Sequence, residues 1–234
     1  MCQEYDSHND NIIFFNQFLT LSDSEIERIS FLAIQGDGQS AFELASHYTF
    51  GQINETLAIY WSTIGAENNF LKSKYNLAFD LLLIKNIVHN KRGIFWLRTA
   101  AREGDSDAKY YISRQLMLPI KDGSLLDDNS YIYAQQSLSK QEIEYCEDGA
   151  LRGSGMAALS ISLYYRNIKS DKDRYEYWFR IGAQNGNAEC QYNYGMILYA
   201  KGKKLDRERG LFWLSRAAEN GHELSRKELE HLKQ

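Results

Sequence analysis

Apolar and polar residues follow a helical pattern that repeats along the chain. Residues 187–221 contain two apolar runs with helical spacing, joined by a polar turn rich in Gly and Lys. The second run holds Trp213, then the small pair Ala217 and Ala218, and ends at Gly221. Residues three or four apart share one face of a helix, so this stretch predicts two helices, A and B, joined by a turn.

The end of helix B recurs up the chain. An aromatic residue is followed five positions later by Ala and eight positions later by Gly or Asn. The sets are Trp61, Ala66 and Asn69; Trp96, Ala101 and Gly104; Tyr145, Ala150 and Gly153; Trp178, Ala183 and Gly186; and Trp213, Ala218 and Gly221, with a weaker copy ending at Ala33 and Gly36. A Gly or Asn at this point supplies the left-handed residue that commonly ends a helix.

Helix A follows each of these end residues with its own pattern. A mostly small residue lies four positions on (Ser40, Ser73, Ala108, Ala157, Cys190, Ser225) and an apolar one eight positions on (Leu44, Leu77, Ile112, Ile161, Tyr194, Leu229). The end residues 36, 69, 104, 153, 186 and 221 are spaced by 33, 35, 49, 33 and 35 positions. Such periods are typical of stacked helical units, so the pattern predicts an all-α solenoid of antiparallel helix pairs forming one continuous body.

The spacing divides the chain into caps and repeats. Residues 1–36 are expected to form an N-terminal helical cap, with a short apolar helix at 11–20 and a capping box of Ser22 and Glu25. Residues 37–222 hold five repeats, at 37–69, 70–104, 105–153, 154–186 and 187–221. Residues 223–234 are expected to form a C-terminal capping helix with a charged outer face.

The third repeat is longer than the others, with the extra length near 117–139. This stretch holds the only proline, Pro119, and the acidic pair Asp127 and Asp128. Ser139 and Glu142 then form a second candidate capping box. Two interpretations stay open. The insertion either adds a short helix near 128–137, or it is a contact element that binds a partner through Asp127, Asp128, Tyr131 and Tyr133.

Composition and motifs argue against several classes of function. The net charge of −4 argues against a nucleic-acid or anionic-membrane surface, and no apolar stretch reaches the length of a membrane span. The sequence contains none of the common zinc, phosphate-loop or serine-hydrolase motifs, and its five histidines are scattered. We therefore expect no metal, no cofactor and no catalysis.

Cysteine usage bears on localisation. Cys2, Cys146 and Cys190 make an odd count without paired spacing, which favours a reducing compartment, and Cys190 is expected to be a buried thiol. The expected location is the cytoplasm. The alternative is that Cys2 is the lipid-anchored first residue of a mature periplasmic lipoprotein.

Residues 36–234 resemble the bacterial Sel1-like repeats, relatives of the tetratricopeptide repeat. Their pattern is roughly A-x-x-x-L-G-x-x-Y, a Gly-rich turn, and A-x-x-W-x-x-x-A-A-x-x-G, which residues 192–195 and 214–221 match closely. The resemblance implies a right-handed α-solenoid that binds other proteins, and it is nearly silent on activity.

The resemblance also implies which residues are exposed on the concave face. Carried over by position, the exposed A-helix residues lie six, ten and thirteen positions past each end residue. They include Leu159 and the partner-binding candidates Phe79, Arg114, Met196, Arg166, Tyr199, Tyr75, Tyr110 and Tyr192. At position six an alternative stays open, because a tyrosine there can simply pack between repeats.

These observations favour a non-catalytic protein-binding module. The specific hypothesis is an immunity or inhibitor protein that neutralises one dedicated bacterial toxin or effector. The alternatives are a general adaptor or signalling scaffold, an envelope or host-interaction lipoprotein, and, last, a hydrolase with an unrecognised site.

Overall fold

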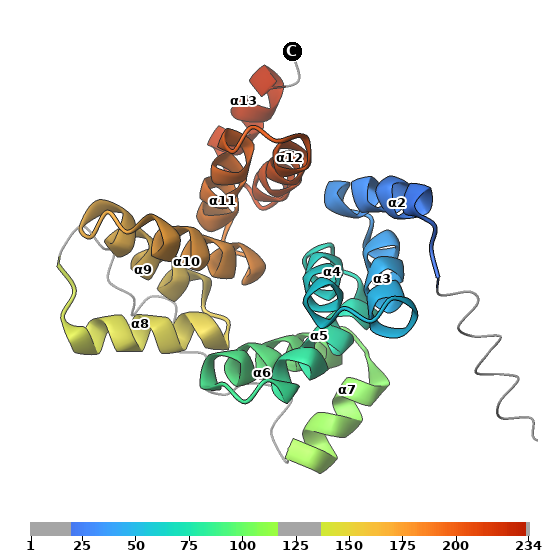
Figure 1. Cartoon of the computed structure of the whole chain (residues 1–234). Helices are drawn as coiled ribbons and strands as arrows, with labels where there is room; N and C mark the ends of the chain where they lie inside the picture. The colour runs from blue at the N-terminus through green and yellow to red at the C-terminus, as the bar shows by residue number, and fades with distance from the viewer. Residues whose placement is uncertain (1–19, 117–136, 233–234) are drawn as a thin grey trace, which may run out of the picture. The chain divides into compact units, whose positions relative to one another are not determined.

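The computed structural model describes residues 20–116 and 137–232, and within these ranges it is helical and has no strand (Figure 1). The chain divides into two compact units, Met1–Leu77 and Ala78–Gln234, and the division falls within one helix. The single continuous body that the sequence pattern predicted stays a prediction.

In the first unit, three α-helices pack in sequence order and the fourth begins. The helices are α2 (Asp23–Gln35), α3 (Gly38–Ser46), α4 (Glu55–Glu67) and the first part of α5 (Leu71–Leu83), with a π-helical turn, η1 (His47–Gly51), extending α3. The core contains Ile29, Ala33, Leu44 and Trp61. Buried His47 accepts a hydrogen bond at Nδ1 from the Leu21 backbone N–H, at 3.1 Å, which ties the start of the described chain to η1.

The second unit continues from α5. Its helices are α6 (Ile87–Arg102), α7 (Ser106–Tyr110) with the π-helical turn η2 (Tyr111–Leu116), α8 (Lys140–Arg152), α9 (Gly155–Asn167), α10 (Lys172–Gln184), α11 (Ala188–Ala200), α12 (Lys204–Glu219) and α13 (Glu223–Leu232). The predicted pairs α9–α10 and α11–α12 pack closely, and α10 also packs on α11 (Figure 1). This is the stacking of A and B helices that the pattern predicted.

All six predicted end residues adopt a left-handed backbone. The φ angles are 120°, 66°, 113°, 116°, 88° and 88° at Gly36, Asn69, Gly104, Gly153, Gly186 and Gly221. Asn69 is the one residue among them with a side chain, and its Oδ1 accepts a hydrogen bond from Lys74 Nζ. Asparagine tolerates this conformation because its short polar side chain bonds locally.

Four of the A helices begin with a side chain that caps them. Asp37, Asp105, Ser154 and Asn187 directly follow an end residue, and each accepts a hydrogen bond from a backbone N–H two or three residues later. Both predicted capping boxes, Ser22 with Glu25 and Ser139 with Glu142, are present. These caps satisfy N–H groups that the first helical turn leaves unpaired.

The small residues mark close contacts between helices. A Cβ atom built on Gly182 would lie 2.3 Å from Cys190 Sγ, and one on Gly65 would lie 2.2 Å from Ser73 Oγ. Gly65 and Gly182 each lie four positions before an end residue, and Ser73 and Cys190 lie four positions after it. The same pair of positions thus brings helix B against the next helix A in both units.

The tryptophan position distinguishes the third repeat from its neighbours. Trp61, Trp96, Trp178 and Trp213 are all at most 7% exposed, whereas Tyr145 at the same position in α8 is 42% exposed. The short α7 packs on α6, while α8 packs on α6, α9 and α10. Helix α8 is therefore held by helices of the second and fourth repeats.

Arg92 makes the contact between those two repeats. Its guanidinium is buried, with Nη1 donating to Asn185 Oδ1 at 2.8 Å and Nη2 donating to Gln184 Oε1 at 2.9 Å. It also lies 4.0 Å above the Phe95 ring, on its own helix. The B helix of repeat two thus binds the end of the B helix of repeat four directly.

Several predicted elements lie outside the described residues. They are the short helix at 11–20 (described only at Thr20), the insertion over 117–136 with Asp127, Asp128, Tyr131 and Tyr133, and Cys2.

Candidate protein-binding face

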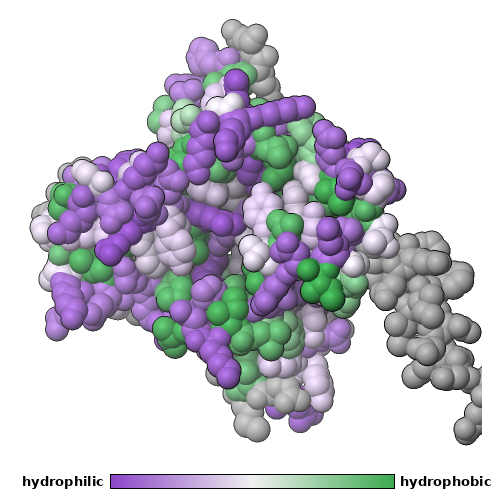
Figure 2. All heavy atoms as spheres, viewed as in Figure 1, coloured by the Kyte–Doolittle hydropathy of each residue, from purple (hydrophilic) through white to green (hydrophobic). Residues whose placement is uncertain are grey.

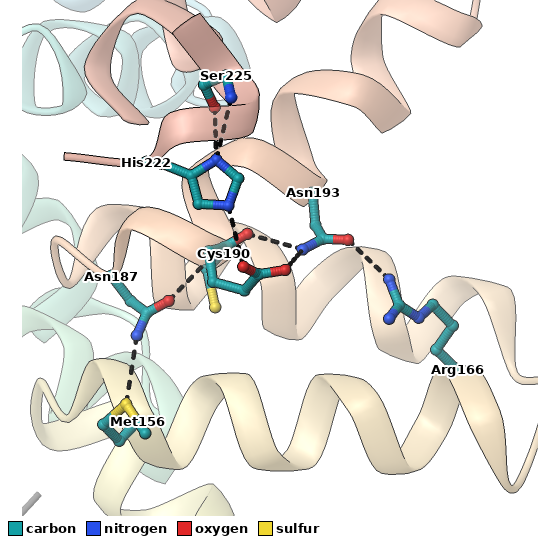
Figure 3. A network of polar contacts seen from close by, with 8 residues as sticks. Met156, Arg166, Asn187, Cys190, Asn193, His222 and Ser225 are labelled. Carbon is teal, nitrogen blue, oxygen red and sulfur yellow. Dashed lines mark hydrogen bonds and ion pairs between the residues drawn. The ribbon is translucent and has the colours of Figure 1, made fainter. Parts of the chain in front are cut away.

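The A helices α9, α11 and α13 share a network of polar contacts (Figure 3). Arg166 on α9 donates from Nη1 to Asn193 Oδ1 on α11 at 2.7 Å. Asn193 Nδ2 donates in turn to Glu189 Oε1, one helical turn earlier, at 2.9 Å. Glu189 Oε2 is 3.0 Å from Nε2 of His222, which directly precedes α13. The network thus runs from helix A of repeat four to the C-terminal helix.

His222 caps α13. The backbone N–H of Ser225 donates to His222 Nδ1 at 3.2 Å, so Nδ1 carries no proton and Nε2–H donates to Glu189. The ring also stacks on Tyr192, with centroids 4.6 Å apart. His222 therefore occupies the same capping position as Asp37 or Asn187 in earlier repeats.

Ser225, His222 and Glu189 together have the composition of a catalytic triad. Ser225 Oγ lies 3.0 Å from His222 Nδ1. However, the Ser225 side chain is fully buried, so a substrate has no access to its hydroxyl. Ser40 Oγ donates to the capping Asp37 in the same way in repeat one. We assign the group to helix capping.

Arg166 is held by three neighbours. Besides the bond to Asn193, its Nε donates to Asn167 Oδ1 at 3.2 Å, and its guanidinium lies 5.3 Å from the centroid of the Phe179 ring. Phe179 is fully buried in α10, so it provides a fixed platform. The Arg166 side chain is half-buried.

Tyr192 and Met196 lie on α11 near this network. Both side chains are half-buried. Burial raises the pKa of the Tyr192 hydroxyl, and Glu228 and Glu189 add to the effect. Because Tyr192 stacks on His222, its ring packs between repeats, while part of the side chain stays exposed.

Tyr199 lies one turn further along α11, beside a cavity of about 320 Å³. The other lining residues are Gly202, Lys204, Arg207, Glu208, Leu211 and Leu232. Arg207 Nη2 donates to the Tyr199 hydroxyl at 2.7 Å, and its guanidinium lies 4.8 Å from the ring centroid. Tyr199 is thereby fixed at the cavity wall.

The remaining candidates lie on other helices. Phe79 on α5 is half-buried against Tyr111 of η2, with ring centroids 4.6 Å apart. Tyr110 on α7 is 61% exposed and Arg114 on η2 is exposed. Tyr75 is half-buried on the part of α5 that belongs to the first unit.

One expected exposed position is wrong. Leu159 is buried, and it packs with Phe179 and Cys190 between α9, α10 and α11. The tetratricopeptide geometry fails here because Leu159 faces the next repeat. Cys190 itself is a buried free thiol, as predicted.

The sequence pattern missed the polar members of the network. Asn193, Glu189 and His222 fall at positions that vary between repeats, so no recurring column marks them. Only the position of His222, directly after Gly221, could have indicated a capping role. Arg92 was missed because its partners lie 93 and 92 residues away.

Comparison with known proteins identifies the repeat. The family model described as Sel1 repeat matches residues 38–70, 85–105 and 188–222. The chain contains Sel1 repeats. The last of these Sel1 matches contains Glu189, Tyr192, Asn193, Met196, Tyr199 and His222. Sel1 repeats are protein–protein interaction modules, and this sets the general class of the chain.

A solved structure is also similar to this Sel1-like chain. It is described as the crystal structure of a Sel1 repeat protein from Oxalobacter formigenes, with 21% identity over 86% of this chain and 78% of that chain, and a TM-score of 0.35. No curated protein is similar enough to count as a relative.

Within residues 20–116 and 137–232, no helix is long and apolar enough to cross a bilayer. Nor do three or more His, Cys, Asp or Glu side chains of those ranges come together in a way that would hold a metal ion.

Proposed function

We propose that this protein binds another protein through the A-helix face formed by Arg166 on α9 and by Tyr192, Asn193, Met196 and Tyr199 on α11, hereafter the α9–α11 face. The observation that carries the proposal is the arginine held on Phe179 beside these half-buried side chains. Aromatic, Met and Arg residues are enriched at protein interfaces, and Tyr and Arg are common among their strongest contacts.

Hydrophilic residues cover much of the visible face of the molecule, and apolar residues form small separate areas between them (Figure 2). A protein interface on a mostly polar surface gains its affinity from a few anchoring side chains surrounded by polar contacts.

As the specific partner, we propose one dedicated bacterial toxin or effector, which this protein neutralises by binding. Three observations support this partner: the interaction repeats, the absence of a recognised catalytic motif in the sequence, and an insertion that is found in repeat three alone among the five repeats. Cytoplasmic residence is part of this proposal, because an inhibitor must meet the toxin in the cell that makes it.

The test uses the native protein and two variants as bait in its own cells, with bound proteins identified by mass spectrometry. Met196→Glu places a charge on the α9–α11 face, and Ile53→Glu is the control, since Ile53 is 85% exposed in the turn before α4. We expect one stoichiometric partner that is retained by Ile53→Glu and lost by Met196→Glu. A toxicity test of that partner, with and without the protein, then addresses neutralisation.

Several unrelated partners would instead indicate a general scaffold. Equal capture by both variants would remove the α9–α11 face from the proposal.

A further inference from the structure

Among the residues that the structure describes, Arg166 has no carboxylate partner. Other arginines of the same unit pair with an acidic side chain one turn away: Arg152 with Asp148 at 2.8 Å, Arg174 with Asp171 at 3.4 Å and Arg226 with Glu223 at 2.9 Å. Arg166 bonds only to the neutral amides of Asn167 and Asn193. A guanidinium carries five N–H donors, so the Nη2 edge of Arg166 keeps donors for a ligand.

The position of that edge is fixed before any ligand binds. Phe179 supports one face of the guanidinium, and two asparagine oxygens accept hydrogen bonds from Nε and Nη1. Asn193 cannot easily turn away, because its Nδ2 donates to both the backbone oxygen and the carboxylate of Glu189. A side chain ordered in this way loses less entropy on binding than a free arginine.

The surroundings favour a single carboxylate over a polyanion. Asn193 separates Arg166 from Glu189, whose side chain is 48% exposed and would repel a second negative charge nearby. Leu163, one turn before Arg166, and Met196, one turn after Asn193, are half-buried and offer apolar contact beside the charge. The chain as a whole carries a net charge of −4, which disfavours nucleic acid.

We propose that the partner presents one Asp or Glu side chain to the Nη2 edge of Arg166, with an adjoining apolar residue over Leu163 and Met196. This deepens the proposed function and rests on it. The recognised feature is a protein segment with a carboxylate next to an aliphatic or aromatic side chain. Planar arginine forks suit this pairing because they bind a carboxylate through two hydrogen bonds.

The experiment selects binders from a displayed library of random peptides with the full-length protein. Selected peptides are then synthesised and titrated against the wild type, Arg166→Gln and the matched control Arg102→Gln. Arg102 is an exposed arginine on α6 that bonds only to Arg98 and Thr99 of its own helix. Thermal unfolding checks that each variant is folded. If Arg166→Gln is not folded, Arg166→Lys, which keeps the charge but not the planar fork, replaces it.

We expect the selected peptides to share an Asp or Glu, and Arg166→Gln to weaken their binding about tenfold or more while Arg102→Gln leaves it unchanged. Replacing the shared acid by its amide should weaken binding to the wild type by a similar factor. It should have little further effect on Arg166→Gln, because the two groups act as a pair.

Other outcomes separate the two proposals. The selected peptides could lack a shared acid, or they could bind Arg166→Gln as well as the wild type but lose affinity for Met196→Glu. Either result would overturn the proposed recognition of a carboxylate, while the α9–α11 face would remain the proposed binding surface. Peptides indifferent to both changes, or a library that yields no binder, would contradict the carboxylate and the face together.

Discussion

Single side chains decide how the repeats of the second unit fit together. Arg92 is buried and charged, a combination that is stable only with good hydrogen-bond partners. It finds them in Gln184 and Asn185, at the end of α10. Asn185 also contacts repeat three and the start of α9, because its Nδ2 donates to the carbonyl oxygens of Ala150 and Ser154 at 2.8 and 3.2 Å. Two side chains therefore link the B helices of three repeats.

The first prediction concerns Arg92. Arg92→Met keeps the apolar contact with Phe95 but leaves the oxygens of Gln184 and Asn185 without this donor. Hydrogen bonds to charged groups contribute about 1.5–3 kcal/mol each, and Arg92 makes two of them, so we expect the free energy of unfolding to fall by about 3 kcal/mol or more. Urea unfolding followed by circular dichroism measures it. The exposed Arg102→Met is the control, and an equal loss in both variants would contradict the role of Arg92.

The second prediction concerns acid stability. Partial burial by itself would raise the pKa of Asp148, yet Lys91 and Arg152 hold it below its ordinary value. A lowered pKa in the folded state gives stability that is present at neutral pH and lost as the pH falls below about 4, the ordinary pKa of Asp. Because solvent screens the pair, we expect Asp148→Asn to cost only about 0.5–1 kcal/mol at neutral pH.

At a pH below the folded-state pKa of Asp148, the wild type and Asp148→Asn should have nearly equal free energies of unfolding. Glu144→Gln serves as the matched control, since Glu144 pairs with Lys140 at 3.7 Å in a highly exposed position. A difference for Asp148→Asn that persists unchanged in acid would show that its ionisation does not matter.

The third prediction concerns the buried thiols. Burial raises the pKa of the Cys146 thiol to about 11, with Glu142 and Glu147 adding to it, and raises that of Cys190 well above its ordinary value. The thiolate is the reactive form, so both should react slowly in the folded protein. In a Cys2→Ser variant, a disulfide reagent at mildly alkaline pH should label both thiols promptly only after denaturation. Prompt labelling of the folded protein would contradict their burial.

At the level of helices, three contacts between successive units use the same position. Asn68 Nδ2 donates to the Ala33 carbonyl oxygen at 2.7 Å, and Asn185 Nδ2 bonds equivalently to Ala150, in each case 35 residues earlier. In the last repeat, Asn220 Nδ2 bonds to Gln191 Oε1, and Gln191 Nε2 bonds to the Ala183 oxygen. An asparagine directly before the end residue thus joins successive B helices, in one case through a glutamine.

The fourth prediction concerns the spacing between α10 and α11. The Gly182 backbone leaves no room for a methyl group beside Cys190 and Ala158. Overpacking of a tight core costs about 1–3 kcal/mol, so we expect Gly182→Ala to lower the free energy of unfolding by that amount. Adding Cys190→Ala removes the sulfur atom and should restore part of the loss. Strict additivity of the two changes would mean that the side chains are not in contact.

At the scale of the whole molecule, the sequence predicted where helices begin and end better than which helices pack on one another. Helix ends, capping boxes and the small positions follow from local backbone chemistry, so they recur with the period and were found. Packing of α8 on α6 was not predicted, because the spacing of 49 residues in repeat three gives no information on which helices meet. The contact of Arg166 with Asn193 was also missed, since it depends on how two A helices are placed side by side.

The contact from Arg92 to Gln184 and Asn185 has a consequence for how the second unit unfolds. In an ordinary repeat array each unit interacts only with its neighbours, so stability is a sum of local terms and the ends can fray independently. A bond that reaches past the adjacent repeat adds a coupling of longer range. Local unfolding of α10 then also breaks the hydrogen bonds of Arg92 on α6. In a hydrogen-exchange experiment, the amide protons of α6 and α10 should therefore exchange as one cooperative group, and Arg92→Met should split that group in two.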